Sequence, residues 1–138
     1  MVPPEQPCPA RVDDGSISDD ERLCRRLIPG WIVWDGPGAP RCSSAAFVDR
    51  HTGEVSVFRA SMTTPDAVLR DHPEDSVGEI ETRVPRGLGY KVVPDPDPGD
   101  PGAAHAVICP KASKSHAKTM AQQTRLTVVR QRVVPQEK

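Results

Sequence analysis

Two short apolar runs separated by a helical pattern constrain the C-terminal part of the chain more than any other feature. His105–Cys109 and Leu126–Val129 have the length and apolar character of strands. The residues from 113 to 123 carry apolar side chains at helical spacing, and Ser113 or Ser115 can serve as the N-cap. A strand, a helix and a strand of these lengths suit a crossover unit whose two strands run parallel in one sheet. We call this segment, from 103 to 134, the C-terminal unit.

The length and composition favour one small domain. A chain of 138 residues with 36% hydrophobic residues can build a single modest core. Four prolines and an absence of apolar periodicity before Gly15 predict a flexible arm. The expected organisation is therefore an arm at 1–17, a globular domain at 18–134 and a short tail at 135–138.

The order of the patterns predicts an α+β or α/β fold, with a mixed sheet of five to six strands and about three helices. The first helix is expected to begin at the capping box Ser18–Glu21 and to leave Arg22, Arg25 and Arg26 facing outward. Threonine followed by proline predicts another helix start at Thr64. Beyond the C-terminal unit, strands are expected at 31–34, 43–48, 54–59, 77–80 and 90–93.

The charge is divided unevenly along the chain. From Ala104 to the end there are seven cations and one anion, a net charge of +6, while the preceding residues carry 11 cations and 18 anions, a net charge of −7. This asymmetry is typical of proteins whose basic end binds an anionic partner. Ion pairs between the two parts of the chain would be compatible with the same net charges. If the basic end binds a ligand, the candidate residues are Lys111, Ser113, Lys114, His116, Lys118 and Arg125.

The four cysteines and four histidines do not show a metal-binding pattern. No two cysteines stand at the short spacing that chelates zinc, so no metal and no cofactor is expected. Cys24 and Cys109 are expected to be small core residues. The sequence shows no signal peptide and no run long enough to cross a membrane, which favours the cytoplasm with reduced cysteines. Thirteen arginines against five lysines are associated with GC-rich, bacterial genomes.

The tetrapeptide from Trp31 to Trp34 is the densest apolar segment. Exposed, the two tryptophans would be anchors for a protein partner, because aromatic side chains dominate interface hot spots. Buried, they would belong to the core, which is the expectation we favour because the chain has only five aromatic residues.

Arginine, serine and paired glutamates also follow one another along the chain. Arg25 or Arg26, then Ser43-Ser44, then Glu79 and Glu81 stand in this order. The order resembles the arginine, serine and paired-glutamate pattern of ADP-ribosyltransferases. That resemblance implies that the arginine and serine would hold a dinucleotide and that a glutamate would orient the attacking group. The serine motif lacks its third member, and the arginine falls on an expected helix.

Nucleophile, base and orienting group do not occur together in any motif, so no catalytic residue is assigned. We therefore expect a small binding or regulatory module that contacts an acidic protein, a nucleotide phosphate or nucleic acid through the C-terminal unit. The alternative is a compact enzyme that acts on a nucleotide. The oligomeric state does not follow from the sequence.

Overall fold

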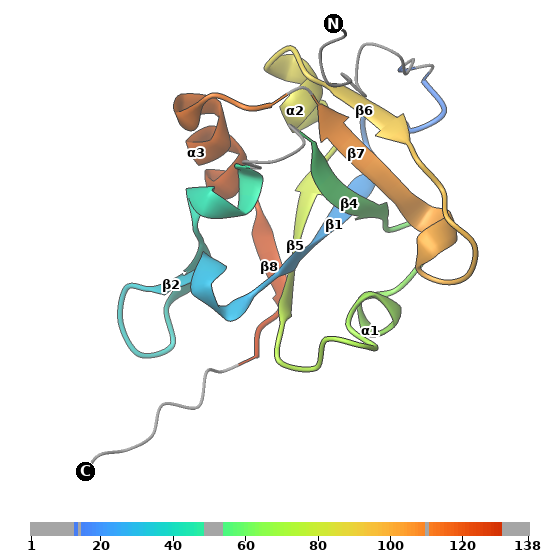
Figure 1. Ribbon diagram of the computed structural model, residues 1–138. Coiled ribbons are helices and arrows are strands. Elements are labelled where there is room, and N and C mark those ends of the chain that lie inside the picture. The colour runs from blue at the N-terminus through green and yellow to red at the C-terminus, as the bar shows by residue number, and fades with distance from the viewer. Residues whose placement is uncertain (1–12, 14, 49–53, 110, 131–138) are drawn as a thin grey trace, which may run out of the picture.

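The computed structural model describes residues 13, 15–48, 54–109 and 111–130. Within them, six strands form one sheet in the order β6-β7-β4-β1-β5-β8, and two more form a separate ribbon, β2-β3 (Figure 1). Every pair of neighbouring strands is antiparallel. The strands are β1 (Arg22–Leu27), β2 (Ile32–Trp34), β3 (Pro40–Cys42), β4 (Val55–Arg59), β5 (Ser76–Glu81), β6 (Lys91–Pro94), β7 (His105–Cys109) and β8 (Arg125–Val128).

Three α-helices and three 3₁₀ turns connect the strands in the described part of the chain. They are α1 (Pro65–Val68), α2 (Arg83–Gly87), α3 (Lys114–Gln122), η2 (Pro29–Trp31), η3 (Ser44–Phe47) and η4 (Gly102–Ala104). The expected α+β fold, with a sheet of six strands and three helices, is confirmed.

The C-terminal unit is present as β7, α3 and β8. Three strands separate β7 from β8 in the sheet, and the alternating directions make these two strands run the same way. The crossover expected from the sequence is therefore correct. The sheet itself has antiparallel neighbours throughout, so parallel strands occur only at a distance.

The sheet has two differently covered faces (Figure 1). Leu23, Leu27 and Ile80 project from one face into the main core, where η3 and α3 supply Phe47 and Met120. On the opposite face, α1 covers a smaller group that includes Cys24 and Val77. The helices thus lie on both sides of an antiparallel sheet.

The helix expected after Ser18 is a strand instead, and this prediction was wrong. Glu21 does not reach back to Ser18 as a capping box requires; its carboxylate accepts hydrogen bonds from Arg59 and Ser61. The following residues pair with β4 on one side and β5 on the other. Burial between two strands outweighs a local helix-start signal, because propensity is a weak determinant of structure.

Two other local predictions need correction. The residues from 43 to 48 are not a strand, because the Ser43 hydroxyl accepts a hydrogen bond from the Ala45 amide and begins η3. Residues 49–53, which connect the strands expected at 43–48 and 54–59, lie outside the described residues. The strand at Trp31 begins only at Ile32, since Trp31 closes the 3₁₀ turn η2.

The end of the expected N-terminal arm contacts the domain where the structure describes it. Ile17 is fully buried in the main core. Asp13 accepts hydrogen bonds from the Arg86 guanidinium and from the Val92 amide. These contacts extend the ordered region by several residues before Ser18.

The cysteines are not all reduced. Cys109 is fully buried on β7 and is disulfide-bonded, whereas Cys24 and Cys42 are free and buried. Burial raises the pKa of the Cys24 thiol to about 12 and that of the Cys42 thiol to about 11. Neither free thiol is therefore an activated nucleophile. Among the described helices, none combines the length and hydropathy needed to cross a bilayer.

Candidate functional site

Helix α3 and strand β8 carry the basic residues of the C-terminal unit. The Ser113 hydroxyl accepts a hydrogen bond from the His116 amide, so Ser113 is the N-cap expected from the sequence. Ala117, Met120 and Ala121 are buried against the core. The opposite side of the helix faces solvent. Five cations are exposed along the described part of this segment, and we call them the basic surface: Lys111, Lys114, Lys118, Arg125 and Arg130.

The cations of the basic surface have no ion pair with any described residue of the chain. The segment from 111 to 130 itself contains no aspartate or glutamate. Its charge of +5 is thus not neutralised within the part of the chain that the structure describes.

The arginines of the preceding part of the chain behave differently. Arg86 lies 2.6 Å from Asp13 and 2.8 Å from Asp19, and Arg59 lies 2.9 Å from Glu21. Other acidic residues are used in the same way, in the pairs Arg22–Glu79, Arg26–Asp75, Arg41–Asp35, Arg83–Asp20 and Arg83–Glu81. Six arginines before residue 90 are thus paired with carboxylates of the same part of the chain.

His116 lies at the start of α3 in a hydrogen-bonded cluster. Its Nδ1 is 2.7 Å from the Tyr90 hydroxyl, and that hydroxyl accepts a hydrogen bond from the Ser113 amide. The two rings also pack edge to face. These contacts join α3 to the residue preceding β6. His116 thus has a structural partner, and the Tyr90 ring is not free to stack on a base.

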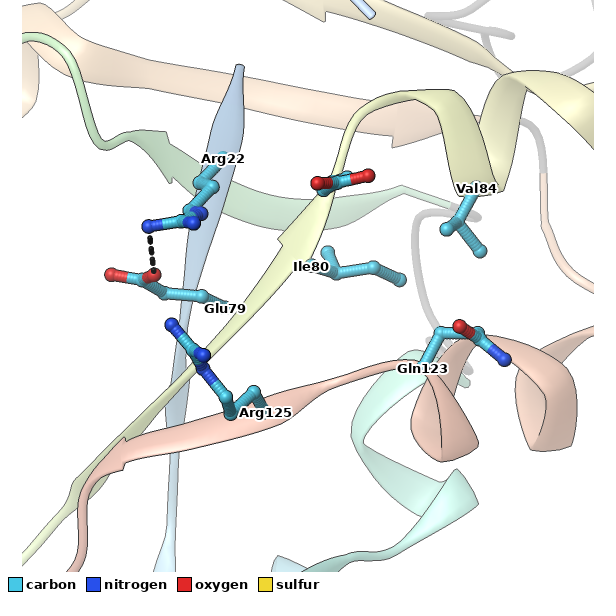
Figure 2. A pocket seen from close by; sticks show the side chains of 7 residues that line it. Arg22, Glu79, Ile80, Val84, Gln123 and Arg125 are labelled. Carbon is cyan, nitrogen blue, oxygen red and sulfur yellow. Dashed lines mark ion pairs between the residues drawn. The ribbon is translucent and has the colours of Figure 1, made fainter. Parts of the chain in front are cut away.

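A cleft of about 310 Å³ lies where β5 ends and β8 begins (Figure 2). The antiparallel register places Glu79 of β5 directly opposite Arg125 of β8. Arg22 reaches Glu79 from β1, but their charged atoms are 4.0 Å apart, at the outer limit of an ion pair. The full lining is Arg22, Glu79, Ile80, Glu81, Val84, Gln123 and Arg125.

The residues that resemble the ADP-ribosyltransferase pattern do not gather at one site. Arg25 donates to the Ala46 and Ser56 carbonyls and lies over the Trp31 ring, on the core face of the sheet. Because Arg25 pairs with Gly78, the neighbouring Glu79 projects from the opposite face.

The other members of that pattern have separate roles. Arg26 makes an ion pair with the buried Asp75, and the Ser43 hydroxyl caps η3. Of the whole set, Glu79 and Glu81 are the members that line the cleft. The prediction that Arg25 faces outward was wrong, because its side chain lies on the core face of the sheet.

The two tryptophans have different environments. Trp31 is half-buried and packs against the main core beneath Arg25. Trp34 is 37% exposed at the end of β2, so its expected burial was wrong. This exposure keeps Trp34 as a candidate contact for a partner.

His105, the other histidine of the C-terminal unit, also has structural partners. His105 Nδ1 lies 2.9 Å from the Asp95 carbonyl oxygen, and its ring packs against Phe58. The residues that the structure describes hold no cluster of three potential metal ligands.

Comparisons with known proteins do not assign the chain to a class: no family model, no curated protein and no solved structure matches it. The cleft residues missed by sequence reasoning are Arg22, Ile80, Val84 and Gln123. They lie on β1, on β5, on α2 and directly after α3, and no local motif connects them. Their only signal is the strand register, which a single sequence does not give.

Proposed function

We propose that the protein is a binding or regulatory module that contacts an anionic partner through the basic surface. The observation that supports this most strongly is the difference between two groups of cations. Six arginines before residue 90 pair with carboxylates, whereas the five cations of the basic surface have no such partner among the described residues. Exposed charges without internal partners favour association with a surface of opposite sign.

An acidic protein segment is the partner that we favour over nucleic acid. Binding to single-stranded nucleic acid commonly uses aromatic side chains as stacking platforms. The aromatic ring nearest to α3 in the hydrogen-bonding network is Tyr90, and its hydroxyl and ring are engaged by His116. Trp34 is the more exposed of the two tryptophans and can add an apolar contact to a protein interface.

The compartment is part of the same proposal. The sequence favours the cytoplasm, whereas the disulfide at Cys109 is the state expected in an oxidising compartment. The cytoplasm, proposed from the sequence, and the disulfide at Cys109 predict opposite redox states for this thiol in the cell. Alkylation of the chain directly on cell lysis tests the proposed location: a free Cys109 thiol agrees with the cytoplasm, and an intact disulfide contradicts it.

Retention on immobilised polyglutamate and on an immobilised oligonucleotide tests the proposed contact. The variant K111Q/K114Q/K118Q should elute from polyglutamate at much lower salt than the unchanged protein, because three unpaired cations are lost. A matched control, R41Q/R70Q/K91Q, removes the same charge elsewhere and should elute near the unchanged protein.

Three results would contradict the proposal. Equal elution of both variants would show that only net charge matters. Unchanged elution of the lysine variant would remove α3 as the contact. Stronger, lysine-dependent retention on the oligonucleotide, with a salt slope that falls by about 0.9 per lysine removed, would favour nucleic acid over an acidic protein.

A further inference from the structure

A second group of exposed charges lies around α1 and in the loop that leads to η4. Five carboxylates there make no ion pair with any residue that the structure describes. In the segments 61–74 and 94–104, which hold these carboxylates, Arg70 is the single arginine or lysine. The charge of −5 on the five carboxylates is equal and opposite to that of the basic surface. We call these residues the acidic surface: Asp66, Asp71, Glu74, Asp97 and Asp100.

The two segments of the acidic surface are held together. The Thr63 hydroxyl donates to the Asp100 carboxylate at 2.6 Å, and the Arg70 guanidinium donates to the Asp100 main-chain carbonyl at 3.0 Å. Four prolines between residues 94 and 101 fix the backbone of the loop further. A surface that is ordered in advance loses little conformational entropy when a partner binds to it.

The acidic surface and the basic surface cannot neutralise each other within one copy of the chain. Helix α3 packs on the main-core face of the sheet through Ala117 and Met120, whereas α1 covers the opposite face through Val68 (Figure 1). The sheet lies between the two helices, and each stacked layer adds roughly 10 Å, so the helices are roughly 20 Å apart. At physiological salt, charges in water are screened beyond about 8 Å. Direct contact between the two surfaces therefore requires two copies.

We propose that the partner of the basic surface is a second copy of this chain, which presents its acidic surface. This inference rests on the proposed function, because it names the partner of the same surface. The lysines of α3 in one copy donate to the aspartates around α1 in the next copy, as charge-assisted hydrogen bonds. Each surface also has an exposed apolar side chain beside its charges, Val129 next to Arg130 and Met62 next to Thr63. These side chains can add apolar contacts between the charged groups.

The arrangement is head-to-tail. Because the two surfaces lie on opposite sides of the sheet, each copy at the end of an assembly keeps one surface free, and association continues beyond the dimer unless a ring closes. A separate acidic protein is the alternative partner. It would bind the basic surface but would give the acidic surface no role, whereas a second copy accounts for both surfaces.

Sedimentation velocity of the full chain tests this proposal. At about 0.1 M salt, the average sedimentation coefficient should rise with protein concentration past that of a dimer. At about 1 M salt, where the Debye length falls from about 10 Å to about 3 Å, the protein should be monomeric. A protein that is monomeric at every concentration and at both salt levels overturns the proposal.

Two variants and a matched control assign the contact. K111Q/K114Q/K118Q and D66N/D71N/D97N should each associate at least about tenfold more weakly than the unchanged protein, because each loses three charged partners. The control D20N/D35N/E81Q removes three exposed carboxylates elsewhere and should associate as the unchanged protein does. Equal weakening in the control would show that only net charge matters and would overturn the assignment.

Charge reversal provides a complementation test. K111E/K114E/K118E carries acidic groups on both surfaces, and D66K/D71K/D97K carries basic groups on both. Each variant alone should be monomeric, with the circular dichroism spectrum of the unchanged protein, and an equimolar mixture of the two should associate. A mixture of folded variants that stays monomeric overturns the proposal.

Retention on polyglutamate separates this proposal from the proposed function, because it needs the basic surface alone. D66N/D71N/D97N should be retained at least as well as the unchanged protein. Lysine-dependent retention of a protein that never associates with itself would overturn the second copy as the partner and leave the proposed function intact. Retention and self-association that are both unchanged in K111Q/K114Q/K118Q would overturn both.

Discussion

Arg25 shows how one charged side chain can be accommodated on the core face of a sheet. Its Nε lies 2.9 Å from the Ala46 carbonyl oxygen, and one terminal nitrogen lies 2.8 Å from that of Ser56. The guanidinium carbon is 4.8 Å from the centre of the Trp31 ring. Hydrogen bonds and cation–π contact compensate the loss of water. Arg25 thereby links β1 to β4, η2 and η3.

Two carboxylates near the N-terminus make the fold sensitive to acid. Burial alone would raise the pKa of Asp13, but hydrogen bonds from Arg86 and the Val92 amide more than offset it, so the pKa lies below its usual value. Burial alone would also raise the pKa of Glu21. Hydrogen bonds from Arg59 and Ser61 more than offset this effect, so the pKa of Glu21 is lowered. Both groups are charged at neutral pH and stabilise the fold in that form.

The sign of the pH dependence follows from these directions. A carboxyl group whose pKa is lower in the folded state stabilises the fold above its unfolded pKa, about pH 4, and loses this contribution as the pH falls through the lowered value. We predict that Asp13→Asn and Glu21→Gln lower the free energy of unfolding at pH 7 and make it depend less on pH below about pH 4. Urea unfolding at several pH values measures both effects.

An exposed carboxylate provides the control for this prediction. Glu74 is exposed and has no ion pair among the described residues. Glu74→Gln should therefore leave the pH profile unchanged. The free energy of unfolding should depend less steeply on pH in Asp13→Asn and in Glu21→Gln. If it depends on pH as steeply in these variants as in the unchanged protein, these ion pairs do not contribute to stability.

Strand β5 depends on a glycine where it approaches β8. A Cβ added to Gly78 would lie 2.5 Å from the Thr124 methyl carbon and 3.2 Å from a Leu27 methyl carbon. The β5–β8 register shifts between Val77 and Gly78. The missing side chain therefore lets the residue before β8 pack closely against the sheet.

The contact between Gly78 and Thr124 can be tested with a destabilising variant and a second substitution that relieves it. Gly78→Ala should lower the free energy of unfolding by about 1–3 kcal/mol, because the added methyl group overpacks the site. The double variant G78A/T124S should recover most of this loss, since serine lacks the methyl group but keeps the hydroxyl that donates to the Met120 carbonyl. Equal stability of the single and double variants, with Thr124→Ser alone as control, would rule out this contact as the cause.

The elements that sequence predicted best are those with purely local signals. Ser113 and Thr64 both cap helices as expected, because each needs only an amide two or three residues ahead. The segment after Ser18 also carried a local signal, but pairing with β4 and β5 decided its structure. Partners far away in sequence are not visible in a capping pattern.

The candidate sites divide in the same way. Ser113, Lys114 and Lys118 could be placed on one helix from spacing alone. The cleft could not, because Arg22, Glu79 and Arg125 meet only through the order of β1, β5 and β8 in the sheet. A single sequence contains no measure of strand order, so such a site becomes visible only in the assembled fold.

For the molecule as a whole, the partition of charge is the central claim. Six arginines before residue 90 pair with carboxylates of the same part of the chain, whereas the basic surface has no ion pair within the described residues. Internal pairs stabilise the fold, whereas exposed and unpaired cations add little or repel one another. The two groups of cations should therefore differ in their effect on stability.

Urea unfolding of two variants tests this claim most directly. K111Q/K114Q/K118Q should keep its free energy of unfolding within about 0.5 kcal/mol of the unchanged protein, as surface substitutions without contacts do. Arg86→Gln should lose more than about 1 kcal/mol, because it removes charge-assisted hydrogen bonds to Asp13 and Asp19. A lysine variant that loses as much stability as Arg86→Gln would show that the lysines are paired internally, and it would contradict the account.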